Sequence, residues 1–163
     1  MKGFEEIISR YQSVIFRFLF HFTGNLADAE DITQETFLNL YRKMALYNAA
    51  QPLSSWLITM ARNLAVSNHR KRTPTPLDPE VLARTIKGFA TGPENEVLSR
   101  ESAQEVHLAV QKLPDQLREV LIMRYFLDLP LQDVAELLNI PEGTAKSRVF
   151  KARNELREII GTR

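Results

Sequence analysis

The chain has no cysteine among its 163 residues. This absence excludes disulfide cross-links, a thiol nucleophile and thiolate metal sites, and it is compatible with a reducing cytoplasm. Histidine is scarce as well, since only His21, His69 and His107 occur and their spacing matches no metal-ligand pattern. The segment "GTAKS" lacks both the spacing of a phosphate-binding P-loop and a preceding strand. We therefore expect a protein that is not an enzyme and that holds no metal, cofactor or small-molecule substrate.

A long hydrophobic run is also missing. The most apolar stretch, "YQSVIFRFLFHF", is interrupted by Arg17 and is too short to span a bilayer. The N-terminus lacks the charged, apolar and small-residue regions of a signal peptide. These features predict a cytoplasmic chain that does not insert into a membrane.

The chain also lacks a strong charge imbalance, because its formal net charge is only +1. Residues 1–72 carry +3, whereas residues 73–95 and residues 96–163 each carry −1. The overall charge therefore does not indicate nucleic-acid binding. Such a function must come from local clusters of basic side chains.

Apolar residues recur with helical spacing along nearly the whole chain, and no convincing run of alternating β-branched residues is present. This pattern predicts an all-α fold, with helices at 4–23, 28–47, 52–72, 96–112, 114–127, 131–139 and 142–160. Residues 73–95, between the two groups of helices, contain four of the eight prolines. We predict two small helical domains, residues 1–72 and 96–163, joined by a Pro/Gly-containing linker at 73–95.

The segment "LQDVAELLNIPEGTAKSRVFKARNELREI" is typical of a helix-turn-helix, with a short apolar helix, a tight turn at "NIPEG" and a second helix. The apolar residues of the first helix, Val134, Ala135, Leu137 and Leu138, and one face of the second, Ala145, Val149, Ala152 and Leu156, are expected in the core. On the other face we predict base contacts in the DNA major groove from Ser147, Phe150 and Lys151. The flanking Thr144, Lys146, Arg148 and Arg153 suit DNA as well, and we assign phosphates to Thr144, Arg148 and Arg153. A solvated basic face is the alternative, which an outward-facing Phe150 disfavours.

The third predicted helix contains the only tryptophan. At about 100° per residue, its expected core stripe is Leu57, Met60, Ala61, Leu64 and Asn68, while another side collects Trp56, Thr59, Asn63, Ser67 and Arg70. The basic end "HRKR" adds Lys71 and Arg72. Such a set can stack on an unpaired base, bond to its edge and hold the backbone. The alternative is that Trp56 packs under the loop "YNAAQPLSS" and that the basic end is merely solvated.

The second predicted helix has two unlike sides. Its buried side is expected to be Ala29, Ile32, Thr33, Thr36, Phe37, Leu40 and Met44, and Asp31, Gln34, Glu35, Leu38 and Arg42 lie opposite. Acidic side chains do not face DNA, and Leu38 is an apolar residue among polar ones, which suggests a protein partner. A solvated helix with one incidental exposed leucine is the alternative.

Together these motifs resemble the extracytoplasmic-function (ECF) sigma factors, a compact group of bacterial RNA polymerase specificity subunits in the sigma-70 family. The likeness rests on three segments in order: "DAEDITQETFLNLYR", "WLITMARNLAVSNHRKR" and "LPDQLREVLIMRYFLDLPLQDVAELLNIPEGTAKSRVFKARNELR". It implies a sigma region 2 helical bundle at 1–72 and a sigma region 4 helix-turn-helix at 96–163.

The resemblance also implies partners. Asp31, Gln34, Glu35 and Leu38 match positions that dock on the β′ clamp helices of core RNA polymerase, beside contacts to the β subunit. Trp56, Asn63 and their neighbours match the part that opens the −10 promoter element, and Lys146, Ser147, Phe150 and Lys151 match the face that reads the −35 element. An anti-sigma factor is a further expected partner.

Two other functions are compatible with the residues. A helix-turn-helix regulator that is not a polymerase subunit would bind its operator tightly by itself, but it leaves the Trp56 side without a role. A helical adaptor that binds no DNA would tolerate Lys151→Glu and Arg148→Glu. If the chain has either of these functions, promoter-specific transcription by core polymerase does not depend on it, whereas a sigma factor is required for such transcripts.

Overall fold

The computed structural model describes residues 2–47, 50, 52–68 and 100–161. These residues form helices and turns without a strand, in two compact units, Met1–Thr73 and Pro74–Arg163. The predicted all-α fold with two helical domains is confirmed. The proposed linker at 73–95 lies outside the described residues, so its bounds stay a prediction. Within the described ranges, no helix combines the length and the apolar character needed to cross a membrane.

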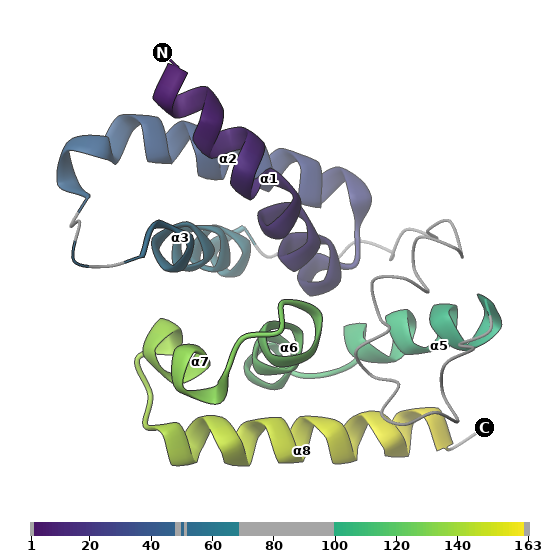
Figure 1. The fold of residues 1–163 in the computed structure, drawn as a ribbon. Coiled ribbons are helices and arrows are strands. Elements are labelled where there is room, and N and C mark those ends of the chain that lie inside the picture. The colour runs from purple at the N-terminus through teal and green to yellow at the C-terminus, as the bar shows by residue number, and fades with distance from the viewer. Residues whose placement is uncertain (1, 48–49, 51, 69–99, 162–163) are drawn as a thin grey trace. The chain divides into compact units, whose positions relative to one another are not determined.

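Unit 1 is a bundle of three helices, α1 (Lys2–Thr23), α2 (Leu26–Lys43) and α3 (Leu53–Ser67), with a short 3₁₀ turn η1 (Met44–Leu46) after α2 (Figure 1). Each of the three helices packs against the other two. Gly24 ends α1 as predicted, because its φ of 70° is a left-handed conformation that glycine adopts without strain. Asn25 then starts α2, since its side-chain oxygen accepts from the Asp28 N–H at 2.9 Å.

The core of unit 1 is rich in phenylalanine and leucine. Phe18, Leu19, Leu40 and Leu57, drawn from all three helices, are fully buried. Thr33 and Thr36 are also buried in α2, and their hydroxyls donate to the carbonyls of Ala29 and Ile32, four residues earlier in the helix. These bonds satisfy the two hydroxyls, so they can lie in the core without a desolvation penalty.

Two predictions for α2 are wrong in detail. The second helix ends at Lys43 and not near Tyr47, and Met44 is 41% exposed although it was expected on the buried side. The 3₁₀ turn that follows α2 has a different number of residues per turn, so Met44 leaves the buried stripe.

The buried stripe of α3 is Leu57, Ile58, Ala61 and Ala65. Met60 and Leu64 are only half-buried, and Asn68 is exposed at the C-cap, so the expected stripe is corrected. At 100° per residue, the centre of the observed buried stripe is rotated by roughly 60° about the helix axis from the centre of the expected one. The physical reason is that α3 packs against both α1 and α2, and the residues facing both neighbours are buried.

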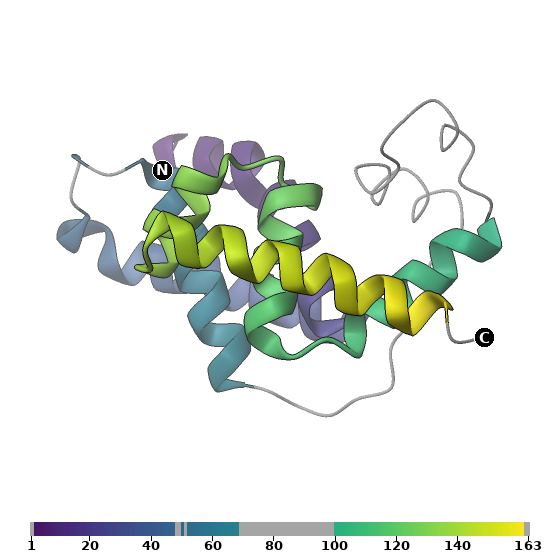
Figure 2. The same cartoon turned by 90° about the horizontal axis from the view of Figure 1, so that it is seen from below.

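Unit 2 contains α5 (Arg100–Gln111), α6 (Asp115–Leu121), η4 (Ile122–Phe126), α7 (Leu131–Leu138) and α8 (Glu142–Gly161). The long helix α8 packs against α5, α6 and α7, and it runs beneath them in Figure 1 and in front of them in Figure 2. The single helix expected at 114–127 consists of two parts in the structure, α6 and then the π-helical segment η4. In that segment the Leu127 N–H donates to the Ile122 carbonyl, five residues earlier, at 3.1 Å.

Arg118 connects α6 to the end of α5. Its side chain is buried, and its guanidinium donates to the carbonyls of Val110 at 3.2 Å, Gln111 at 3.2 Å and Leu113 at 2.8 Å. Burial lowers the pKa of Arg118, whereas the Asp115 carboxylate 3.5 Å away raises it. The guanidinium thus supplies donors to carbonyls at and just beyond the α5 terminus, of which that of Val110 also accepts from the Leu113 N–H at 3.2 Å.

The helix-turn-helix prediction agrees with the structure of α7, the turn and α8. Asn139 ends α7 with a φ of 55°, a left-handed conformation that asparagine tolerates better than most residues. Val134 and Ala135 are buried as expected, but Leu137 and Leu138 are only half-buried, because this short helix contacts the rest of the unit on one narrow side.

Candidate nucleic-acid interface

The outer face of α8 presents the side chains predicted to read DNA. Ala145, Val149, Ala152 and Leu156 are buried, as the sequence predicts. We call Lys146, Ser147, Phe150 and Lys151 the reading face, and all four are exposed. Phe150 is 67% exposed, so a large aromatic ring faces solvent on a helix whose other side is fully packed. A ring exposed in this way can lie against a thymine methyl in the major groove.

The three residues predicted to hold phosphates are less exposed than the reading face. Thr144, Arg148 and Arg153 are half-buried. The guanidinium of Arg153 lies over the ring of Tyr125, with its Cζ atom 5.5 Å from the ring centroid. This contact could not be predicted from a local pattern, because Tyr125 belongs to η4 and is far from Arg153 along the chain.

The second candidate surface lies on unit 1 and contains the tryptophan. We call Trp56, Thr59, Asn63 and Ser67 the Trp56 face; the first two are half-buried and the last two exposed. Because the buried stripe of α3 is rotated toward Ile58 and Ala65, this face points away from the core more directly than the sequence suggested. Arg70, Lys71 and Arg72 lie outside the described residues.

Trp56 is not isolated on this side of α3. Its ring centroid is 5.1 Å from that of Tyr47, and the two planes are tilted by 32°. Tyr47 belongs to the loop before α3, so the packing resembles the alternative in which the tryptophan rests against that loop. The Trp56 side chain is nevertheless only half-buried, as is that of Tyr47, and the pair forms a partly exposed aromatic surface of two rings.

The outer side of α2 is the third candidate surface. We call Asp31, Gln34, Glu35, Leu38 and Arg42 the docking face, and all five side chains are exposed. Leu38 is 53% exposed, and Tyr41 is exposed to the same extent one turn later. Leu46 in η1 is 77% exposed. The apolar content of this end of unit 1 therefore exceeds one incidental leucine, which favours a protein partner over a solvated helix.

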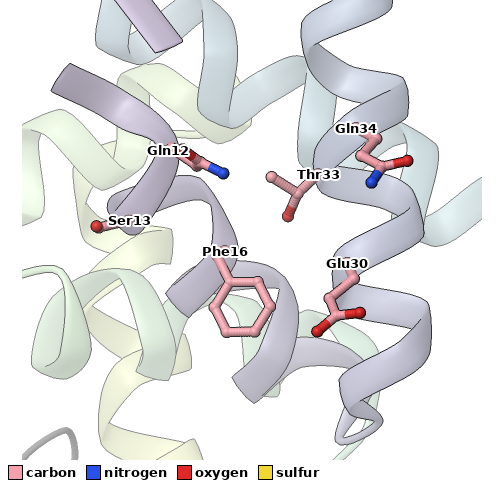
Figure 3. A pocket seen from close by; sticks show the side chains of 6 residues that line it. All are labelled: Gln12, Ser13, Phe16, Glu30, Thr33 and Gln34. Carbon is pink, nitrogen blue, oxygen red and sulfur yellow. The ribbon is translucent and has the colours of Figure 1, made fainter. Parts of the chain in front are cut away.

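A groove lies beside the docking face, between α1 and α2. It has a volume of about 450 Å³ and is lined by Gln12, Ser13, Phe16, Glu30, Thr33 and Gln34 (Figure 3). Gln34 belongs to the groove and to the docking face, so the two are continuous. Glu35 connects the docking face to the end of α3, because its carboxylate accepts from the Asn68 side-chain amide at 3.4 Å.

Comparison with known proteins identifies the family. The Sigma-70 region 2 family matches residues 7–75, and the Sigma-70 region 4 family matches residues 103–156. The chain is 34% identical to the ECF RNA polymerase sigma factor SigW of Bacillus subtilis, over 96% of this chain and 88% of that protein. The chain belongs to the ECF sigma factors. It is also 29% identical to the RNA polymerase sigma-H factor of Pseudomonas aeruginosa, over 95% of this chain and 84% of that one.

Solved structures show the same fold. The sigma factor RpoE of Bartonella quintana, crystallised with the anti-sigma factor NepR, superposes with a TM-score of 0.72 at 21% identity over 99% of both chains. CnrH, in complex with the cytosolic domain of CnrY, gives a TM-score of 0.75 at 18% identity over 98% of this chain and 88% of that one. The fold of this ECF sigma factor is thus shared with proteins of much lower sequence similarity.

Proposed function

We propose that this ECF sigma factor binds core RNA polymerase, recognises the −35 and −10 elements of its promoters and promotes their opening. The observation that carries the proposal is the helix-turn-helix of unit 2, in which α8 buries one apolar stripe and exposes Phe150 among basic and hydroxyl side chains. The sigma factor supplies specificity rather than a catalytic centre. We place it in the cytoplasm, where its polymerase and promoters are.

The −35 element is read as duplex DNA by α8. The major groove admits one α-helix, and lysine, serine and an aromatic edge suit the donors, acceptors and thymine methyl groups found there. Lys146, Ser147, Phe150 and Lys151 therefore contact base edges, while Thr144, Arg148 and Arg153 on the flanks hold phosphates. The first group sets the sequence preference and the second sets the position of the helix on the duplex.

The −10 element is captured by the Trp56 face as unpaired bases. Unstacking one base costs on the order of a few kcal/mol, and stacking on an aromatic ring returns roughly 1 to 3 kcal/mol. The tryptophan therefore cannot melt DNA by itself, but it can trap a base that has already left the duplex. Asn63 and Ser67 bond to the base edge, and Arg70, Lys71 and Arg72 hold the adjacent backbone.

Core RNA polymerase binds the docking face of α2. In this proposal the carboxylates of Asp31 and Glu35 meet basic residues on the β′ clamp helices, and Leu38 fills an apolar site between them. The β subunit contacts other parts of the sigma factor. When both units are held on one polymerase, two weak DNA contacts act as one strong contact, because the second binding step becomes intramolecular. Free sigma factor should thus bind promoters poorly.

An anti-sigma factor is the remaining proposed partner. The two solved relatives are described as complexes, RpoE with the anti-sigma factor NepR and CnrH with the cytosolic domain of CnrY. We propose that a protein of this kind binds the present chain and covers its polymerase- and DNA-binding surfaces.

The deciding experiment is transcription from a library of promoter fragments with purified sigma factor and bacterial core polymerase. We expect specific run-off transcripts that require both proteins. A regulator that is not a polymerase subunit would instead bind its operator tightly without polymerase. Failure of the chain to associate with core polymerase would exclude the proposed function.

Leu38→Glu is expected to weaken polymerase binding at least tenfold, because it places a charge in the apolar centre of the docking face. The dissociation constant can be measured with labelled sigma factor and core polymerase. Leu108→Glu is the matched control, since Leu108 is an exposed leucine of α5 in unit 2. Equal loss of binding in both variants would contradict the assignment of the docking face.

Lys151→Gln is expected to relax the sequence preference at one position of the −35 element, because one good base contact contributes about 1 to 3 kcal/mol of discrimination. Selection of promoter fragments with the variant holoenzyme measures this preference directly. Lys112→Gln, at an exposed lysine beyond the end of α5, removes the same charge elsewhere in unit 2. An unchanged preference in the Lys151 variant would mean that this side chain does not read bases.

A further inference from the structure

The side chain of Asn63, on the Trp56 face of α3, is held by the residue before it. The Nη1 atom of the Arg62 guanidinium donates to the Oδ1 atom of Asn63 at 3.1 Å. Arg62 is half-buried and Asn63 is exposed. Successive side chains of a helix point about 100° apart, so this contact requires the long arginine side chain to turn toward its neighbour. Arg62 thus reaches the Trp56 face from the flank of the helix.

The chemistry of this pair fixes which way the Asn63 amide points. A guanidinium carries only N–H donors, whereas an asparagine amide has an acceptor oxygen at one end and a donor NH₂ group at the other. Only the oxygen can therefore face Arg62, because the reverse orientation would bring donors together and lose the hydrogen bond. The Asn63 NH₂ group consequently points away from Arg62, and it has no hydrogen-bond partner among the described residues.

The bases differ in what they offer to an NH₂ group held in this way. Guanine and thymine carry a carbonyl oxygen, O6 or O4, where adenine and cytosine carry an amino group, N6 or N4. A carbonyl oxygen accepts from the Asn63 NH₂ group, and the bond from Arg62 to the other end of the amide polarises and strengthens this contact. An amino group would instead meet further donors. The two-bond pair of asparagine with adenine is also weakened, because it needs the amide oxygen that Arg62 occupies.

We propose that Arg62 is a positioning residue that orients the Asn63 amide, and that the −10 base in contact with Asn63 is therefore a keto base, guanine or thymine. The inference rests on the proposed function, because it requires the Trp56 face to hold −10 DNA. It adds the class of base and the side chain that selects it. Trp56 contributes stacking, which every base can provide, whereas Arg62 and Asn63 together discriminate between bases.

The test is selection of promoter fragments, randomised across the −10 element, by holoenzyme reconstituted from this chain and core polymerase. At one position, guanine and thymine should be enriched over adenine and cytosine by roughly three- to tenfold, the range for a single hydrogen bond. R62M keeps an apolar stem but has no donor, so the amide can turn either end to the base, and the enrichment should disappear at this position alone. R62K retains a cation with donors only and should restore part of it.

Variants of Asn63 identify the position and test the sign of the preference. N63A should abolish the preference at the same position as R62M. N63D replaces the NH₂ group by a second acceptor oxygen, so the preference should change to adenine and cytosine, whose amino groups donate. R10M makes the R62M exchange at an exposed arginine of α1 and should leave every base preference unchanged. Thermal unfolding followed by circular dichroism checks that each variant is folded.

Exchange of a single group on the DNA tests the same contact. On a template that is already unpaired across the −10 element, adenine at the selected position is replaced by hypoxanthine, which has a carbonyl oxygen in place of the amino group. Wild-type holoenzyme should bind the hypoxanthine template several-fold more tightly. R62M holoenzyme should bind both templates equally.

Three results would overturn the inference. The first is a wild-type preference for adenine or cytosine at the position that N63A affects. The second is an R62M variant that weakens binding to all sequences equally, because Arg62 would then contact a phosphate and not orient Asn63. The third is an N63A variant with unchanged base preferences, while specific transcripts remain. If the wild-type chain instead confers no promoter-specific transcription on core polymerase, the proposed function itself fails, and this result appears before any variant is made.

Discussion

Trp56→Ala is expected to reduce transcription from duplex promoters roughly 5- to 150-fold, which corresponds to the loss of about 1 to 3 kcal/mol of base stacking. The reason is that the Trp56 ring traps a base only after that base has left the duplex. Loss of the ring therefore returns the promoter to the closed state. On a template that is already unpaired across the −10 element, most of the defect should disappear. Run-off transcription on matched duplex and pre-melted templates measures both values.

The contact between Trp56 and Tyr47 calls for controls on folding. Trp56→Phe keeps an aromatic face, so it should retain much of the activity on duplex DNA. Tyr47→Ala removes the partner ring, 5.1 Å away, and leaves the tryptophan in place. If the Trp56→Ala defect persists on the pre-melted template while the thermal stability of the variant is normal, the tryptophan does not act in promoter opening.

Arg118→Met is expected to destabilise unit 2 by about 3 kcal/mol or more, because it removes three buried or partly buried hydrogen bonds from the guanidinium to the carbonyls of Val110, Gln111 and Leu113. Methionine fills part of the volume, so the effect reports the lost hydrogen bonds more than a cavity. Arg118→Lys should recover only part of the stability, since an ammonium group lacks the fork that reaches three acceptors. Urea unfolding followed by circular dichroism measures these differences.

The single tryptophan gives this experiment an internal reference. Trp56 belongs to unit 1, so its fluorescence follows the unfolding of that unit, whereas circular dichroism follows the helices of both. Arg118→Met should move the dichroism transition to lower urea and leave the fluorescence midpoint where it is. Lys112→Met, an exposed site near the end of α5, should change neither. An unshifted dichroism transition would show that the Arg118 bonds contribute little.

The local patterns were sufficient for much of the fold. Helical spacing predicted the stripe Ala145, Val149, Ala152 and Leu156, and all four residues are buried in α8. Gly24 was expected to end the first helix and does so in a left-handed conformation. These features depend on residues within one or two helical turns of each other, so a period and a stop signal are enough to find them.

Features that depend on two elements were not predictable in the same way. The rotation of the α3 stripe toward Ile58 and Ala65 follows from contact with two helices at once. The end of α2 at Lys43 was missed as well, because the apolar period continues past it into a 3₁₀ turn. In both cases the periodic pattern was present, and tertiary packing selected which part of it is buried.

For the candidate surfaces, too, features of a single helix were predictable and contacts between elements were not. The sequence by itself determined the all-α class, the helix-turn-helix, the membership of the docking and reading faces and the separation of Trp56 from the core, because each is a property of one helix and its spacing. The tertiary structure decided that Trp56 contacts Tyr47, which the sequence left as one of two alternatives, and it alone brought Arg124 and Arg153 onto Tyr125. Contacts between elements far apart in the chain depend on the angles at which helices pack, and no local period encodes those angles.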